Sequence, residues 1–336
     1  MRIQGGLDSC VGRLTRGAIA IGNFDGVHLG HLGLFDAALS ASRQDPGPSA
    51  ALTFEPHPAK LLAPDYAPPR ITTLDRKREL CAAAGLDVLV EQPFDRAFAS
   101  LAPGDFVERV AKTGVSQVVV GPDFTYGRDR KGTVETLRNE LSERAIRLHV
   151  VLPITVHGLV VSSTKVREFA LEGRVQAAAA LLGRPLDLDG EVVRGEGRGR
   201  KLGFPTANIR TAAELLPKVG VYAVRARVQE SGATPHGPVD AGGGFAFHPP
   251  RSGPALAAAA NLGLNPTFRA DAHAGAGREQ VVLEVHLLDT DRDLYGAILR
   301  VEFHHRLRDE RRFPSVEVLQ KQIANDVAEA RRLLAP

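Results

Sequence analysis

The sequence predicts an α/β protein in which a doubly wound parallel sheet is followed by an antiparallel β-barrel with a closing helix. Three observations lead to this prediction. Strand-like apolar runs alternate with helical patterns up to residue 152, strand-like segments follow one another between 188 and 305, and residues 316–334 carry a single apolar helical stripe. A chain of 336 residues has room for two domains, which we place at residues 1–185 and 186–336.

The composition is that of an ordinary globular protein, with 43% hydrophobic and 24% charged residues. The net charge of +3 is small for this length, so it favours small anionic ligands as much as nucleic acid. Cys10 and Cys81 are far apart and offer neither a disulfide framework nor metal-ligand spacing. No apolar run of about eighteen residues appears, and no long apolar segment follows Met1. We therefore expect a cytoplasmic protein without a membrane span.

The first half begins with a short apolar strand at 18–21, a glycine-rich segment and a helix bearing Leu32, Phe35 and Leu39. Further strands are expected at 51–54, 88–90, 118–120 and 149–152, separated by helices at 74–84, 106–112 and 134–141. This alternation predicts a mostly parallel sheet, whose ligands bind beyond the carboxyl ends of its strands.

The glycine-rich segment, residues 22–31, suits the binding of a phosphate. Gly22, Gly26 and Gly30 let the backbone approach a ligand, and the helix that follows directs its positive end at the same point. His28 and His31 share one side of the first helical turn and can donate hydrogen bonds to a phosphoryl group as its charge grows. Two other interpretations stay open: a helix cap with surface histidines, and a zinc pair that would need further ligands.

Within residues 22–31, the four residues from His28 to His31 resemble the His-x-Gly-His signature of the nucleotidyltransferase superfamily. The longer match, which includes Phe24 and Asp25, resembles the flavin-adenylylating branch of that superfamily. Pro56-His57-Pro58, Asp123-Phe124 and the segment 162–167 resemble the other signatures of bifunctional FAD synthetases, in the same order. The resemblance implies an ATP site at Gly22, Phe24, Asp25, His28, His31, Asp123, Ser163, Thr164 and Arg167, and a flavin site at Pro56, His57, Pro58, Asp123 and Phe124. Taken alone, 162–167 is better interpreted as an ordinary helix cap, and only the histidine motif beside it favours a phosphate site. His57 could shape its loop without touching substrate.

In the second half, a helix at 175–182 ends at Gly183, and strands are expected at 188–194, 221–228, 281–288 and 297–305. The closing helix should pack on the barrel through one stripe, formed by Val316, Leu319, Ile323, Val327, Ala330 and Leu334. Between Val228 and Asn261 the chain is rich in Gly, Pro and Ala, which we interpret as a mobile loop.

Residues 195–208 combine alternating glycine and arginine with Thr206 and Asn208, whose oxygens lie on one side of an extended segment. Neutral oxygens together with substrate phosphates suit Mg²⁺. An RNA-binding patch or a flexible linker is the alternative, although no aromatic platform for stacking bases accompanies the arginines.

The tail of this segment, Pro205-Thr206-Ala207-Asn208, resembles a signature of riboflavin kinases, and residues 283–289 resemble the strand that carries the catalytic glutamate of that family. The resemblance implies that Glu284 is the general base and that Thr206 and Asn208 hold Mg²⁺. It further implies ATP contacts at Gly197, Arg200 and Lys201 and flavin contacts at Asn261 and Arg308. From the residues alone, Glu284 is also compatible with a solvent-facing strand position.

Together the two resemblances imply an enzyme that converts riboflavin to FMN in its C-terminal domain and FMN to FAD in its N-terminal domain. Its partners would be riboflavin, FMN and ATP, without nucleic acid or membrane, in a monomer or weak homo-oligomer. Two rivals remain: an adenylyltransferase for another phosphorylated acceptor, and a non-catalytic regulator that binds flavin, nucleotide or RNA.

Overall fold

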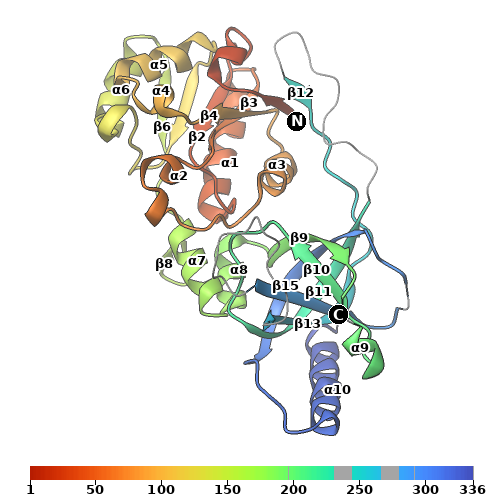
Figure 1. The fold of residues 1–336 in the computed structure, drawn as a ribbon. Coiled ribbons are helices and arrows are strands. Elements are labelled where there is room, and N and C mark those ends of the chain that lie inside the picture. The colour runs from red at the N-terminus through yellow and green to blue at the C-terminus, as the bar shows by residue number, and fades with distance from the viewer. Residues whose placement is uncertain (196, 231–243, 266–279, 291, 336) are drawn as a thin grey trace. The chain divides into compact units, whose positions relative to one another are not determined.

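The computed structural model describes residues 1–195, 197–230, 244–265, 280–290 and 292–335. It contains two compact units, residues 1–163 with 233–249 and residues 164–232 with 250–336 (Figure 1). The first unit holds a parallel sheet and the second a closed antiparallel barrel, so the predicted fold class is confirmed. The predicted boundary at 185/186 falls within the second unit and stays a prediction.

The sheet of the first unit has the strand order β12-β1-β4-β3-β2-β5-β6. All neighbours are parallel except β12, which runs antiparallel to β1. The strands are β1 (Arg2–Gln4), β2 (Ala18–Ile21), β3 (Ser49–Glu55), β4 (Val88–Pro93), β5 (Gln117–Val120), β6 (Arg147–Val150) and β12 (Phe245–Ala246). The strand predicted at 149–152 begins and ends two residues earlier, and Leu152, beyond its end, is exposed.

Helices cover both faces of this sheet, as β2 illustrates. Ile19 and Ile21 enter a core with residues of α5 and α6, whereas Ala18 and Ala20 enter a second core with residues of α1 and α3. The helices are α1 (Leu29–Gln44), α2 (Pro58–Leu62), α3 (Leu74–Ala83), α4 (Arg96–Ala99), α5 (Pro103–Lys112) and α6 (Val134–Ser142), with short 3-10 turns η1 (Leu7–Cys10), η2 (Pro64–Tyr66) and η3 (Arg128–Arg130). A hairpin of β7 (Thr155–Val156) and β8 (Leu159–Val160) follows.

Strand β12 comes from the Gly, Pro and Ala-rich stretch and completes the sheet edge. Phe245 and Ala246 pair with Ile3 and Arg2, and the Phe247 N–H donates to the Met1 carbonyl at 2.8 Å. Phe247 is 1% exposed and belongs to the core that contains α1. The interpretation of this stretch as a mobile loop is therefore wrong for 245–247, because burial of an aromatic ring outweighs local composition. Residues 231–243 lie outside the described residues.

The barrel closes in the order β10-β14-β13-β11-β15-β9, with every pair antiparallel. Its strands are β9 (Leu186–Val193), β10 (Ala207–Thr211), β11 (Gly220–Gln229), β13 (Leu256–Asn265), β14 (Gln280–Leu287) and β15 (Ile298–Arg308). Strands β10 and β13 were not predicted from the sequence. The mobile-loop interpretation is also wrong for 256–260, the start of β13, because these residues form ladder pairs with β11 and, from Ala258 onward, with β14 as well.

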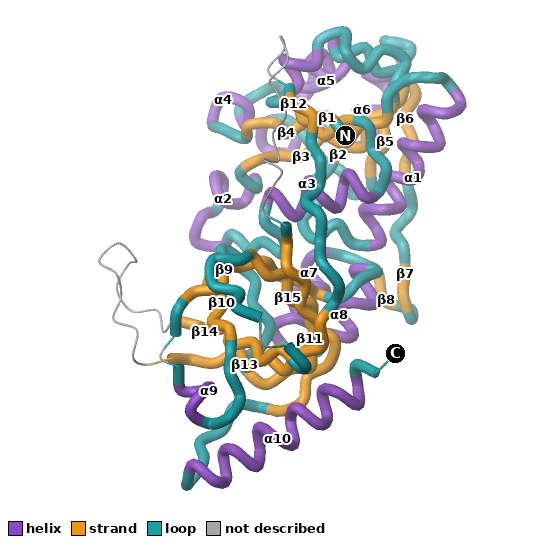
Figure 2. The backbone as a smooth tube through the Cα atoms, turned by 90° about the vertical axis from the view of Figure 1, so that its right-hand side faces the viewer, coloured by secondary structure: helices purple, strands orange, loops and turns teal. Residues whose placement is uncertain are grey.

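Among the described residues, four helices accompany the barrel: α7 (Ser163–Leu171), α8 (Val175–Leu182), α9 (Arg198–Lys201) and α10 (Val316–Leu333). Figure 2 shows α10 lying along the outside of the barrel. Ala330 and Leu334 pack against Ala223 and Ala259, which confirms the predicted docking for the C-terminal part of the stripe, whereas Val316 at its start is exposed. No helix among the described residues is long and apolar enough to cross a membrane.

Candidate functional site

Three loops that carry predicted site residues leave the same edge of the parallel sheet. They follow β3, β2 and β5, which are neighbours in the sheet, and they contain residues 56–58, 22–31 and 123–124 respectively. The chain reverses its direction of strand addition between β2 and β5. This is the position at which doubly wound sheets bind their ligands, so the histidines flank the expected binding point.

The two histidines are fixed at the start of α1. His28 is the N-cap, and its Nδ1 accepts a hydrogen bond from the His31 backbone N–H at 3.3 Å. In a neutral ring the proton of His28 is then on Nε2. The two imidazoles stack with ring centres 3.6 Å apart, and Phe24 meets the His31 ring edge to face at 5.3 Å. The sequence therefore places two imidazoles together at a helix N-terminus.

The loop that leads to these histidines, residues 22–27, has a backbone that few residues adopt. Phe24, Gly26 and Val27 have φ angles of 49°, 84° and 40°. A Cβ on Gly26 would lie 2.9 Å from the Ile71 side chain, so glycine is needed there for space as well as for conformation. Left-handed backbone at Phe24 and Val27 costs on the order of 1–3 kcal/mol each and persists only where the surroundings hold it.

Asp25 is one of the groups that hold this loop. Its buried carboxylate accepts hydrogen bonds from the backbone N–H groups of Ile71 at 3.0 Å and Thr72 at 3.4 Å. The Ser163 hydroxyl donates to the Asp25 carbonyl at 2.9 Å. Asp25 and Ser163, which the sequence assigned to ATP, thus have contacts that shape the loop.

Other predicted residues of the first unit occupy the neighbouring loops. His57 is the N-cap of α2, and its Nδ1 accepts from the Ala59 N–H at 3.2 Å, while Pro58 is the first residue of the helix. This contact matches the loop-shaping role that the sequence left open for His57. Asp123 is exposed and Phe124 is half-buried in the loop after β5.

Gly22, Thr164 and Arg167 complete the predicted ATP set. A Cβ on Gly22 would lie 3.0 Å from the Phe24 ring, so the glycine makes room for that side chain. Thr164 and Arg167 lie on α7, and Arg167 is buried. Their roles remain predictions.

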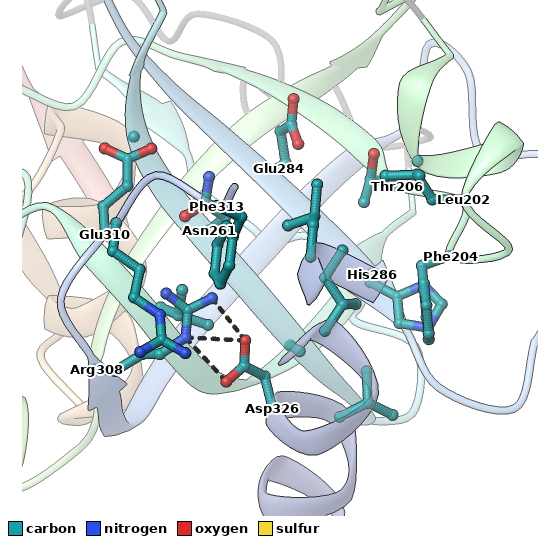
Figure 3. A pocket seen from close by; sticks show the side chains of 18 of the residues that line it. Leu202, Phe204, Thr206, Asn261, Glu284, His286, Arg308, Glu310, Phe313 and Asp326 are labelled. Atoms are coloured by element: carbon teal, nitrogen blue, oxygen red, sulfur yellow. Dashed lines mark hydrogen bonds and ion pairs between the residues drawn. The ribbon is translucent and has the colours of Figure 1, made fainter. Parts of the chain in front are cut away.

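Four predicted residues of the second unit, Asn208, Glu284, Asn261 and Arg308, lie in one row around the barrel. The strand registers place Asn208 opposite Glu284, Glu284 opposite Asn261, Asn261 opposite Val221, and Val221 opposite Arg308. Glu284, Asn261 and Arg308 line a cavity of about 810 Å³ between the outer face of the barrel and α10 with the segment before it. Figure 3 shows Glu284 and Thr206 on one side of this cavity and Arg308 with Asp326 on another.

Arg308 is bound to a carboxylate of α10. Its Nε lies 3.0 Å from both carboxylate oxygens of Asp326, and its Nη2 lies 2.7 Å from Oδ2 (Figure 3). Asp326 is buried and also accepts from the Gln322 amide at 2.8 Å. This ion pair holds α10, which forms one wall of the cavity, against the barrel. Asp326 was not predicted, although a carboxylate between Ile323 and Ala330 on an otherwise apolar stripe was a visible signal.

The turn before β10 connects this cavity to a second one. His286 hydrogen-bonds through Nδ1 to the Pro205 carbonyl at 2.7 Å, and its ring meets the Phe204 ring at 5.6 Å. These contacts fix the position of Thr206, which lines both the large cavity and a neighbouring cavity of about 420 Å³. Arg200 lines the smaller cavity, so Thr206 lies where the two meet.

The donor groups of Thr206 and Asn208 match the chemistry of Mg²⁺. A Cβ on Gly195 would clash with the Asn208 amide, so the glycine leaves the space that this amide occupies. Neutral oxygens of this kind supply few ligands and rely on substrate phosphates for the rest, as Mg²⁺ requires. Of the other predicted ATP contacts, Gly197 has a φ of 68°, and the Lys201 side chain lies outside the described part of the chain.

Among the described residues, no group of three or more His, Cys, Asp or Glu side chains could hold a metal ion. The zinc interpretation of His28 and His31 therefore lacks its further ligands within that part of the chain.

Comparisons with known proteins match both halves of the chain. Residues 12–165 fit the FAD synthetase family model and residues 182–334 fit the riboflavin kinase family model. Proteins of Bacillus subtilis (strain 168) and Escherichia coli (strain K12), each named bifunctional riboflavin kinase/FMN adenylyltransferase, are 34% and 36% identical. The alignments cover 95% and 93% of this chain and 92% and 91% of those proteins. A crystal structure described as a macrolide-efflux protein from Streptococcus pneumoniae superposes with a TM-score of 0.82 at 30% identity, over 98% of each chain.

Proposed function

Because the chain belongs to the family of bifunctional riboflavin kinase/FMN adenylyltransferases, we propose that the loop with His28 and His31 and the barrel row with Glu284 carry its two reactions. The enzyme uses ATP to phosphorylate riboflavin and to adenylylate FMN. The observation that carries the assignment of residues is the row itself. Five neighbouring strands bring Asn208, Glu284, Asn261 and Arg308 into register, and the last three line a large cavity.

In the kinase reaction, riboflavin occupies the cavity of about 810 Å³, a volume within the range of small-molecule sites. ATP occupies the smaller cavity, which Arg200 lines, so that its γ-phosphate meets riboflavin near Thr206. The ribityl 5′-oxygen bonds to the γ-phosphorus while the bond from that phosphorus to the bridging oxygen breaks. Glu284 accepts the hydroxyl proton, and FMN and ADP are the products.

Thr206 and Asn208 would hold Mg²⁺ beside the ATP phosphates. When bound, the ion supplies neutralisation of the phosphate charge. Asn208 lies opposite Glu284 in the strand register, so the residue that would hold the metal is next to the residue that accepts the proton.

In the adenylyltransferase reaction, an FMN phosphate oxygen bonds to the α-phosphorus of ATP while the bond to the β-bridging oxygen breaks, releasing pyrophosphate. His28 donates through Nε2 and His31 lies stacked against it, so both face charge that develops at one phosphoryl group. The N-terminus of α1 adds its own positive potential. Neither histidine forms a covalent bond with substrate.

Two single-site variants test this division of labour. His28→Ala should lower FAD formation from FMN by about 100- to 1000-fold, the usual cost of removing one transition-state donor, and leave riboflavin phosphorylation intact. Glu284→Gln should stop FMN formation while supplied FMN still becomes FAD. In each variant the untouched activity shows that the other unit is intact, and an unchanged unfolding temperature of the altered unit is the control for its folding. Near-normal FAD output from His28→Ala, or FMN from Glu284→Gln, would refute the corresponding role.

The family assignment favours this enzyme over an adenylyltransferase for another acceptor and over a non-catalytic regulator or RNA binder. A cytoplasmic location, a monomer or weak homo-oligomer, independence of nucleic acid and the domain boundary at 185/186 stay predictions.

A further inference from the structure

Lys77, on α3, is a buried lysine whose short polar contacts converge on the loop before the histidines. Its side chain is 6% exposed. Its Nζ donates to the Asn23 carbonyl at 3.1 Å and to the Thr53 hydroxyl at 3.1 Å. The Thr53 hydroxyl itself donates to the same Asn23 carbonyl at 3.0 Å. One carbonyl of the loop therefore accepts two hydrogen bonds from buried side chains.

Burying the Lys77 ammonium costs free energy of desolvation, and an apolar side chain could fill the same space without that cost. Burial lowers the pKa of Lys77, and the negative charges of Glu55 and Asp25 oppose that shift. The Glu55 carboxylate is 3.9 Å from Nζ, a longer separation than either hydrogen bond. A leucine or methionine would fill the same volume without desolvating a charge. The charge of Lys77 therefore strengthens its hydrogen bond to the Asn23 carbonyl, because a charge-assisted hydrogen bond is stronger than a neutral one.

Asn23 is well placed for such a contact to matter. It comes directly before Phe24, the first of the three residues with positive φ, and five residues before His28. Asp25 is fixed through its own carboxylate and carbonyl, whereas Asn23 is fixed through Lys77 and Thr53. The strained segment is held at both points before the chain enters α1.

We propose that Lys77 is a positioning residue for adenylyl transfer, which together with Thr53 holds the Asn23 carbonyl and thereby sets the positions of the His28 and His31 rings. The inference rests on the proposed roles of these histidines. Displacement of a reacting group by about 1 Å can lower a rate by about 100-fold, so the effect should appear in kcat.

The first test replaces the charge and keeps the length, in Lys77→Met. We expect kcat for FAD formation from FMN to fall about 10- to 100-fold, while the KM values for FMN and ATP change less than about threefold. Calorimetric titration of FMN should give the same number of sites as the wild-type protein, which separates displaced histidines from a partly unfolded unit. Lys112→Met makes the same chemical change at an exposed lysine of this unit and should leave kcat unchanged.

The second test removes the other donor to the same carbonyl, in Thr53→Val, which replaces the hydroxyl by a methyl group of similar size. It should lower kcat by itself, and the double variant should lose less than the product of the two single losses because both act on Asn23. A kcat of Lys77→Met within twofold of wild type, a loss of FMN sites in proportion to activity, or fully multiplicative losses would overturn the inference. Any of these outcomes refutes only the role of Lys77, and not the role of the histidines, if the wild-type protein forms FAD and His28→Ala does not.

Discussion

Replacing Phe247 by alanine should destabilise the adenylyltransferase unit, although this residue belongs to a stretch that interrupts the sequence of the kinase unit. Phe247 is 1% exposed, lies in the core that contains Ile3 and Phe35, and follows the two residues that pair with β1. The variant removes the ring and leaves the backbone pairing unchanged. The loss of stability therefore measures how much the Phe247 side chain contributes to the packing of this unit.

The size of the effect follows from the burial. Loss of a fully buried phenylalanine ring costs about 3–5 kcal/mol, including the cavity that remains. In a unit of this size each kcal/mol lowers the unfolding temperature by about 2–4 °C, so the decrease should be about 6–20 °C. The described residues of the barrel unit contribute nothing to this core, so that unit should keep its own unfolding temperature.

The two activities provide the assay. Samples are heated in steps and then assayed separately for FAD formation from FMN and for FMN formation from riboflavin. We expect Phe247→Ala to lose the first activity at lower temperature and to retain the second, whereas His248→Ala, at the exposed neighbouring position, should match wild type. Equal loss of both activities, or a shift no larger than that of His248→Ala, would contradict the structural role of Phe247.

Two further predictions concern titratable groups. Burial raises the pKa of Glu302, but His304 at 3.7 Å and Arg227 at 3.0 Å lower it by more, so its net pKa is lowered. The ionised carboxylate therefore stabilises the barrel at neutral pH, and this stability is lost as the pH falls below 4.5, the ordinary value. Urea unfolding of Glu302→Gln should show a weaker loss on the acid side, and identical pH profiles would refute this. Burial raises the pKa of the Cys81 thiol to about 12 and also raises that of Cys10, so neither should react with a thiol reagent until the protein is denatured. Rapid labelling of the native protein would show that one of them is accessible.

Much of the fold could be predicted because its signals are local. The buried parallel strands appear in the sequence as continuous apolar runs, such as 118–120, and α10 appears as a regular stripe. Strand β12 could not be predicted, because two residues among glycines and prolines become a strand only when the edge of β1 is available to pair with them. Strand β13 begins with a run of alanines, which have low strand propensity, and its neighbours in the barrel supply the pairing.

The candidate sites likewise contain some residues that the sequence identifies and others that it does not. His28, His31 and Glu284 lie in compact segments whose neighbours identify them. Lys77 and Asp326 escaped prediction because their partners, Asn23 and Arg308, lie far away in the sequence or on another element. Residue type alone does not distinguish a buried lysine on a helix from an exposed one, and only the folded chain reveals which carbonyl it meets.

The most direct test of the central claim is a time course with one purified protein. Riboflavin, ATP and Mg²⁺ are incubated with the wild-type chain, and riboflavin, FMN and FAD are separated by chromatography at intervals. Two sites in one chain predict that FMN appears first and FAD follows as FMN is consumed, with ADP and pyrophosphate as the co-products. Riboflavin that stays unchanged while supplied FMN becomes FAD would contradict the kinase assignment of the barrel, and the absence of product from either flavin would contradict both assignments.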